Sequence, residues 1–250
     1  MARTAEEIVA VVPTAAMAVR EPSRGNVGHY LRLRAASRRL NHDLLAMVPP
    51  GAVDRIGAAI GILCGRTFFF ESESVAAVLA DCCIFDWLED GETAPERYAR
   101  ETPPLEGTYE HEMLEAMLRP RFDIVNVDER RPGVGVVASS MVDGREVRLL
   151  DVDLGRREDV AGETLAVRLL PMGEFWMASA PVLEISRPLA VALLKTFART
   201  SPSRADGPAG PLEDHELVLT VVRAGLEQRR GRQAVAEEAF VLGKTAPAAR

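Results

Sequence analysis

Residues 121–152 read RFDIVNVDERRPGVGVVASSMVDGREVRLLDV, and this stretch decides the fold. Its apolar residues fall into short, β-branched runs at 122–127, 134–137 and 147–152. Pro132-Gly133 separates the first run from the second, and Asp143-Gly144 separates the second from the third. An Asp-Gly pair between two apolar runs is a strong signal for a tight hairpin turn. The stretch therefore predicts consecutive antiparallel strands.

The same pattern continues downstream of this stretch. Further short apolar runs follow at 165–170, 175–177 and 182–185, with Gly162 and Gly173 as turn signals. Short, evenly spaced strands with tight connections are typical of all-β units that roll up or fold back on themselves. We therefore predict an antiparallel β-meander or a small barrel over residues 121–186.

On either side of this β region, the apolar residues repeat at helical spacing. Upstream, the pattern predicts helices at 29–48, 52–64, 72–85 and 109–118, and Pro95 opens a shorter one. Downstream, Pro188 stands at the first position of a helix, and another helix is predicted at 212–229. The predicted fold class is α+β, with a helical N-terminal half, the β-meander or small barrel, and C-terminal helices.

These elements divide the chain into segments that make up one or two compact units. We assign an N-terminal arm to residues 1–27 and a helical region to residues 28–120. The β-meander or small barrel occupies residues 121–186, and C-terminal helices with a mobile tail occupy residues 187–250.

Composition narrows the class of protein. The 250 residues are 47% hydrophobic, which excludes wholesale disorder, and their net charge of −7 argues against a surface coated by nucleic acid. No apolar run reaches about 18 residues, so we expect no membrane partner. The apolar segment at 8–19 follows Glu6 and Glu7 and contains Pro13, so we interpret it as part of the arm and not as a signal peptide.

The cysteines indicate the compartment. The chain has three of them, Cys64, Cys82 and Cys83. An odd number with two adjacent members does not make a disulfide framework, so we interpret them as reduced thiols. Reduced thiols are typical of the cytoplasm, which is the predicted location.

Several phrases of the sequence resemble a known group of proteins. They are RFDIVNVDERRPGVGV at 121–136, LLDVDLG at 149–155 and LAVRLLPMGEFWM at 165–177, with FFFESES at 68–74 and HEMLEAMLRPRFD at 111–123 upstream. Together they resemble a family of uncharacterised bacterial proteins, some of which end in a cysteine-rich SEC-C zinc motif. The likeness spans about residues 28–185 and implies a fold family without an activity. No cysteine follows Cys83, so the zinc motif is absent here.

The segment Arg20–Arg39 is the only strongly basic stretch, and it includes Arg34 and Arg38. These arginines could contact phosphate or an acidic partner. Alternatively, the acidic stretch at 71–90 could pair with them inside the fold. Because charge alone supports the first interpretation, association with nucleic acid is the second hypothesis for the function.

Two residues of the β region are further binding candidates. Arg168 lies midway along an otherwise apolar strand, where it either points to a polar face or meets a buried carboxylate such as Asp151. Trp176 lies between Phe175 and Met177, so it faces the opposite side of its strand. If its neighbours face the core, Trp176 marks an exposed binding face; the alternative is that the helical half covers it.

No grouping of reactive side chains accompanies these features. Asp151, Asp153 and Asp159 cluster near a strand end but do not match a calcium-binding loop, and His111 with Glu115 lacks a third metal ligand. We interpret these groups as structural. We expect neither a cofactor nor a metal, and the catalytic residues of any activity are unknown.

The sequence therefore favours a non-enzymatic cytoplasmic interaction or regulatory module, with a protein as its partner. The surface-binding candidates are Arg34, Arg38, Arg39, Arg168 and Trp176. The alternative is a nucleic-acid-associated protein that uses the Arg20–Arg39 segment. A weaker alternative is an enzyme whose site assembles from distant residues. The oligomeric state is unknown from the sequence.

Overall fold

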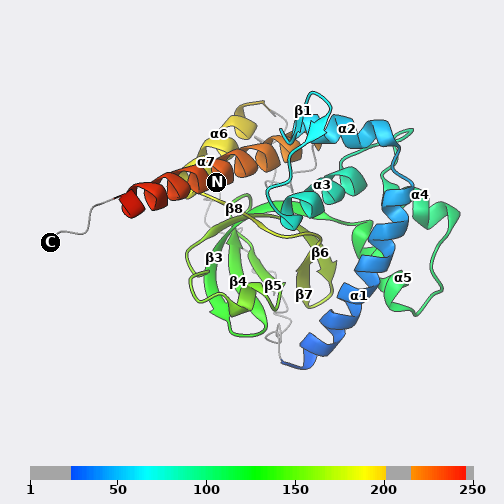
Figure 1. Ribbon diagram of the computed structural model, residues 1–250. Helices are drawn as coiled ribbons and strands as arrows, with labels where there is room; N and C mark the ends of the chain where they lie inside the picture. Colours follow the sequence, from blue (N-terminus) through cyan, green and yellow to red (C-terminus); the bar gives the residue numbers. More distant parts are fainter. Residues whose placement is uncertain (1–23, 201–214, 246–250) are drawn as a thin grey trace, which may run out of the picture.

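The computed structural model describes residues 24–200 and 215–245 (Figure 1). Arg20, most of the predicted N-terminal arm, the loop after Thr200 and the last residues of the tail lie outside the described residues. Within the described part, helices flank a central β unit on both sides in the sequence. The α+β class is confirmed.

Residues 24–117 are mainly helical. Their helices are α1 (Arg24–Ala46), α2 (Pro50–Ala59), α3 (Glu73–Phe85), α4 (Ala94–Glu101) and α5 (Tyr109–Met117). A small hairpin of β1 (Leu63–Cys64) and β2 (Thr67–Phe68) lies between α2 and α3. Thr93 and Glu96 form a reciprocal capping box at the start of α4, which fixes where this short helix begins.

The second half begins with a closed barrel. Its strands are β3 (Arg121–Arg131), β4 (Gly135–Ser140), β5 (Glu146–Leu150), β6 (Thr164–Met172) and β7 (Phe175–Ala178). The strand order is β3-β4-β5-β7-β6, and β6 pairs with β3 to close the ring. The predicted small barrel is therefore confirmed, and a plain meander is wrong, because β5 and β7 pair in parallel at Leu149 and Trp176.

The long strand β3 is what closes the barrel. Its first half, 121–126, pairs with β6, and its second half, 125–131, pairs with β4. A β-bulge between Val127 and Glu129 bends the strand between these two pairings. By this topology, the barrel resembles the five-stranded Greek-key barrels of OB type.

The barrel interior is a dry core of small and branched side chains. They are Val125, Val127, Val136, Ala138, Val147, Leu149, Leu165, Val167, Leu169 and Ala178. Leu154, in the short 3-10 helix η1 (Leu154–Arg156), adds to this core. Gly155 lets η1 lie against the start of β4, because a Cβ there would lie 2.6 Å from the nitrogen of Gly135. Gly135 in turn lets β4 lie close to β5, because its Cβ would lie 2.1 Å from the Leu149 carbonyl oxygen.

A second core lies between the helices and the outer face of β6 and β7. Ala166, Leu170, Phe175 and Met177 point outward from these strands and pack with the buried faces of the helices. Trp176 points the other way, is half-buried, and packs against the barrel core. The helical half therefore covers the neighbours of Trp176 and not Trp176 itself.

The C-terminal elements are β8 (Leu183–Ile185), α6 (Arg187–Thr200) and α7 (His215–Thr245). The prediction that the last helix ends at Arg229 is wrong, because α7 continues and projects beyond the barrel (Figure 1). Its arginines hold it to the body of the protein: Arg229 donates to Ser72, and Arg232 donates to the carbonyl of Glu184. No helix among the described residues is both long enough and apolar enough to cross a bilayer.

Candidate functional site

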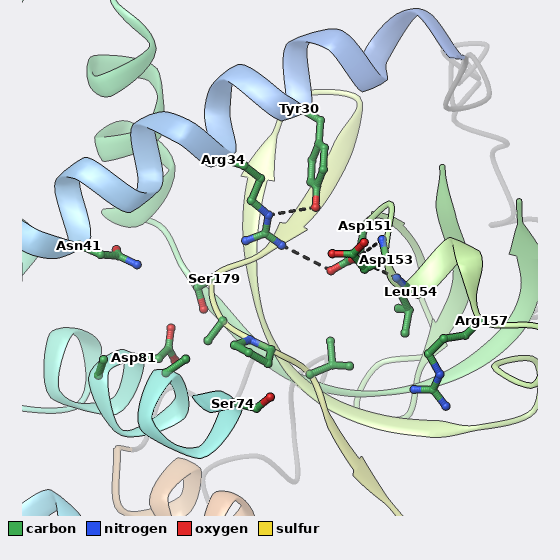
Figure 2. Close-up of a pocket in the computed structure, with 15 residues that line it drawn as sticks. Tyr30, Arg34, Asn41, Ser74, Asp81, Asp151, Asp153, Leu154, Arg157 and Ser179 are labelled. Carbon is green, nitrogen blue, oxygen red and sulfur yellow. Dashed lines mark hydrogen bonds and ion pairs between the residues drawn. The ribbon is translucent and has the colours of Figure 1, made fainter. Parts of the chain in front are cut away.

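A cavity of about 670 Å³ opens where α1 and α3 meet the segments that follow β5 and β7 (Figure 2). Its lining residues are Tyr30, Arg34 and Asn41 of α1, Ser74, Ala77, Ala80 and Asp81 of α3, Asp151, Asp153, Leu154 and Arg157 after β5, and Ser179, Ala180, Pro181 and Val182 after β7. The cavity thus lies at the junction of the helical layer and the barrel.

Helical spacing explains which side chains reach the cavity. Tyr30 and Arg34 are four residues apart and share one face of α1. On α3, Ser74, Ala77 and Asp81 are three and four residues apart and likewise share a face. Because that face carries mostly small side chains, α3 leaves open space in front of α1 instead of packing tightly against it.

Arg34 occupies the centre of the cavity wall. Its Nε donates to the Tyr30 hydroxyl at 3.0 Å, Nη1 donates to the Ala178 carbonyl at 2.6 Å, and Nη2 lies 3.4 Å from Asp151 Oδ2. Burial, ahead of the opposing charge of Arg34, raises the pKa of Tyr30. All three donor groups of Arg34 are therefore used by the protein itself.

Asp151 is mainly a turn residue. Its Oδ1 accepts from the backbone N–H groups of Asp153 and Leu154, at 3.1 and 3.0 Å. These bonds fix the start of η1, and the other oxygen meets Arg34. The structural interpretation of Asp151 fits this geometry. Asp153 is largely exposed, and Asp159 pairs with Arg157 at 3.5 Å.

Arg168 is buried, with 7% of its surface exposed, and does not lie on the protein surface as a binding candidate would. Its Nε donates to Asp81 Oδ2 at 2.9 Å, and its Nη2 donates to Asp86 Oδ2. The guanidinium also packs over the rings of Phe85 and Phe122. Of the two alternatives for Arg168, the buried carboxylate is the correct one, but the partners are Asp81 in α3 and Asp86, which caps the end of α3, and not Asp151.

The buried charges shift one another's protonation. Desolvation by burial raises the pKa of Asp81, although Arg168 opposes the shift. Burial alone would lower the pKa of Arg168, but the charges of Asp86 and Asp81 raise it above its ordinary value. Arg168 therefore stays charged and holds α3 to β6.

Two neutral side chains complete the wall near Asp81. Asn41 Oδ1 is buried and has no hydrogen-bond partner within the described part of the chain. Ser179 is 7% exposed, and its hydroxyl lies close enough to Asp81 to favour the charged carboxylate, but it makes no hydrogen bond of ordinary geometry. Figure 2 shows Asn41, Asp81 and Ser179 grouped at one end of the cavity, with Arg157 at the other.

The basic segment is largely paired within the fold. Arg39 forms an ion pair with Glu110, and Arg32 donates to the Tyr109 hydroxyl at 2.9 Å. Arg38 is exposed, and its hydrogen bond within the described residues is to its own helix, to the Arg34 carbonyl at 3.5 Å. The alternative that the acidic stretch at 71–90 pairs with this segment is therefore wrong for Arg32 and Arg39, because α5 lies against α1 and supplies their partners.

The remaining sequence candidates do not converge on the cavity. His111 and Glu115 lie on α5, and among the described residues no group of three or more metal-ligating side chains exists. Sequence reasoning missed Asn41, Asp81 and Ser179, which come from three separate segments. Their only sequence signal is a polar residue within an otherwise apolar or small-residue face.

The outer face of β4 and β5 is the surface that binds oligonucleotides in OB-type barrels. Here strand alternation places Val137, Ser139, Glu146 and Arg148 on it. Ser139 bonds to Asp128, and Arg148 pairs with Glu146. The face carries no aromatic side chain on which bases could stack, so the topological likeness gives no support to nucleic-acid binding there.

Comparison with known proteins places residues 24–203 in one family. Residues 24–203 match the model of a family described as "Family of unknown function (DUF7986)". No curated protein and no solved structure matches the chain. The matched residues run from α1 through α6, so they include the whole barrel and every residue that lines the cavity.

Proposed function

The chain belongs to this family of unknown function, and we propose that it is a non-enzymatic interaction module that recognises its ligand in the cavity between α1, α3 and the barrel. The cavity itself carries the proposal. Its volume of about 670 Å³ lies within the range of small-molecule sites. It also combines apolar walls with a few convergent polar groups, which is the usual make-up of a binding pocket.

The state of the ionisable groups supports recognition over catalysis. Asp81 is tied to Arg168, Asp151 to Arg34, and Arg157 to Glu163. A general acid or base needs a group that can exchange a proton with the substrate. Among the described residues that line the cavity there is no histidine, cysteine or lysine, so fixed ion pairs dominate its wall.

The cysteines support a cytoplasmic location for this module. Cys64, Cys82 and Cys83 are all free thiols. Cys82 and Cys83 are buried in the helical layer, where oxidation would disturb packing, so a reducing compartment suits the fold. Fractionation of cells that express the full chain tests this part of the proposal: a protein recovered outside the cytoplasmic fraction contradicts it.

The main test fills the cavity from α3. In Ala77→Leu, the larger side chain occupies space inside the cavity, and leucine is nearly as good a helix former as alanine. Ala76→Leu is the matched control, because Ala76 neighbours it on α3 but is exposed and does not line the cavity. Thermal unfolding of the three proteins is measured with a panel of amines, carboxylates, sugars and nucleotides.

The proposal expects at least one compound to raise the midpoint of unfolding of the wild type and of Ala76→Leu but not of Ala77→Leu. If no compound in any class shows this dependence on Ala77, the cavity is not a recognition site. Turnover of a compound that occupies the cavity would contradict the non-enzymatic part of the proposal.

A further inference from the structure

We infer that the ligand of this cavity is an organic cation, an aliphatic chain that ends in a primary ammonium or a guanidinium. The inference rests on the proposed function and adds the chemical class of the ligand. It is carried by Asn41, Asp81 and Ser179, which meet at one end of the cavity. Arg168 donates to Asp81, but within the described part of the chain no donor reaches Asn41 Oδ1 or the Ser179 oxygen in a hydrogen bond of ordinary geometry.

The first argument is the balance of buried charge. Arg168 is the single guanidinium between two carboxylates, those of Asp81 and Asp86. When both carboxylates are ionised, this trio carries an excess negative charge, and Asp81 is the member that lines the cavity. His215 also contacts Asp86, at 3.3 Å, and does not line the cavity. A cation placed in the cavity would compensate the excess charge at Asp81 in a poorly solvated setting.

The second argument is the unused hydrogen-bonding capacity beside Asp81. Asn41 Oδ1 is buried without a partner, and the Ser179 oxygen makes no hydrogen bond of ordinary geometry. Buried oxygens normally accept at least one hydrogen bond. An ammonium carries three donors and no acceptor, so one such group could serve Asn41, Asp81 and Ser179 together.

The third argument excludes the opposite charge. The two arginines that line the cavity already have partners within the protein. Arg34 is hydrogen-bonded to Tyr30, Ala178 and Asp151. Arg157 is surrounded by the carboxylates of Asp159, Glu163 and Glu184. An anionic ligand would have to break these pairs, whereas a cation would leave them intact.

The remaining wall sets the shape of the ligand. The cavity is also lined by the apolar side chains of Ala77, Ala80, Leu154, Pro181 and Val182. These side chains offer only apolar contact, so they suit the methylene chain behind a charged head. A compact inorganic cation would leave this wall without a partner.

The test is titration calorimetry of the full chain with pentylammonium chloride, compared with 1-pentanol and sodium pentanoate, which have the same chain and no positive charge. We expect the amine to bind at least about tenfold more tightly than either control, as expected for hydrogen bonds that involve a charged group. Pentylguanidinium extends the test to the second head group, and we expect it to bind as well.

Three variants locate the binding. Asn41→Leu and Ser179→Ala each remove one acceptor and are expected to weaken amine binding by about tenfold. Asn126→Ala, on β3 and away from the cavity, is the control and should bind as the wild type does. Circular dichroism and the midpoint of thermal unfolding show that each variant is folded, so a lost affinity is not a lost structure.

The outcomes separate the two proposals. Suppose that pentanoate or a neutral compound binds in a way that depends on Ala77 and that the amine does not bind. The cavity is then a recognition site, but the inference that its ligand is a cation is wrong. If amine binding is unchanged in Asn41→Leu and Ser179→Ala, the amine lies elsewhere and the inference fails. A peptide with a central lysine that binds more tightly than the free amine supports the same chemistry, with a partner's side chain as its source.

Discussion

Arg168 in β6 donates to Asp86 at the end of α3, although the two residues are 82 positions apart in the sequence. This bond, with its companion to Asp81, ties the helical layer to the barrel through a buried cation. Asp81 belongs to this ion-pair group and also lines the cavity. The stability of the junction and the chemistry of the cavity therefore depend on the same ion-pair group.

Arg168→Leu should strongly destabilise the protein. The substitution leaves Asp81 and Asp86 buried without their partner, and breaking a buried pair in this way costs about 3–5 kcal/mol. Urea unfolding measures the change in the free energy of unfolding. Arg223→Leu is the control: its pair with Glu227 is exposed, and its loss should cost less than about 1 kcal/mol. Equal costs for both variants would contradict the buried role of Arg168.

Asp123 should make stability fall as the pH rises. Burial raises its pKa above the ordinary value of 3.8, even though Arg121 and Ser140 oppose the shift. The folded protein then binds this proton more tightly than the unfolded chain does. The contribution of Asp123 to the free energy of unfolding is fully present below pH 3.8 and is lost as the pH rises through the raised pKa.

This pH effect is measured against Asp123→Asn, which cannot titrate at that position. The difference in the free energy of unfolding between wild type and variant should move in favour of the variant from pH 3.8 upward. Groups whose pKa values are lowered, such as Glu110, act equally in both proteins and cancel. A difference that is constant with pH would show that Asp123 does not titrate in this range.

The three thiols should differ in reactivity. Cys64 is exposed, whereas burial raises the pKa of Cys83 to about 12 and also raises the pKa of Cys82. Because the thiolate is the reactive form, iodoacetamide near pH 8 should modify Cys64 alone in the native protein. Mass spectrometry counts the modified residues, and unfolding in urea should expose all three. Modification of Cys83 in the folded protein would contradict the packed helical layer.

Gly135→Ala should destabilise the barrel by about 1–3 kcal/mol or more. A Cβ there would lie 2.1 Å from the Leu149 carbonyl oxygen, which is fixed by strand pairing and cannot move aside cheaply. Gly28→Ala is the opposite case, since nothing lies within 4 Å of its added Cβ and it occupies a helix. That variant should gain about 0.5–1 kcal/mol. Thermal and urea unfolding of the two variants check both signs.

The basic segment should not retain the protein on heparin at low salt. Arg39 and Arg34 form ion pairs with Glu110 and Asp151, and Arg32 donates to the Tyr109 hydroxyl. Arg38 is exposed and pairs with no carboxylate within the described part of the chain. Phosphate binding needs several free cations acting together. Retention that weakens steeply as salt is added would contradict this and favour association with nucleic acid.

Local signals explain why the β region could be predicted. The turn at Asp143-Gly144 and the alternating runs around it depend on neighbours in the sequence, and those strands form where expected. The parallel pairing of β5 with β7 could not be predicted, because it joins Leu149 to Trp176 across an intervening strand. For the same reason the sequence indicated that Trp176 differs from its neighbours but not which core it joins.

The cavity was the least predictable feature. The position of Arg168 in an apolar strand indicates either a polar face or a buried carboxylate partner, but nothing local in the sequence identifies Asp81 as that partner. Asn41 and Ser179 are ordinary polar residues in the sequence, and they matter only because the fold brings α1 and the segment after β7 together. Sites of this kind are defined by long-range packing and not by a motif.

The closure of the barrel by β3 has a consequence for how the chain folds during synthesis. β3 needs β6 as its second partner, and the helices need the outer face of β6 and β7 to cover their apolar sides. The helical half leaves the ribosome first, before that face exists. Its apolar helix faces therefore stay exposed to solvent until about the end of β7 has emerged from the ribosome. We expect chaperones to bind the nascent chain mainly in this interval.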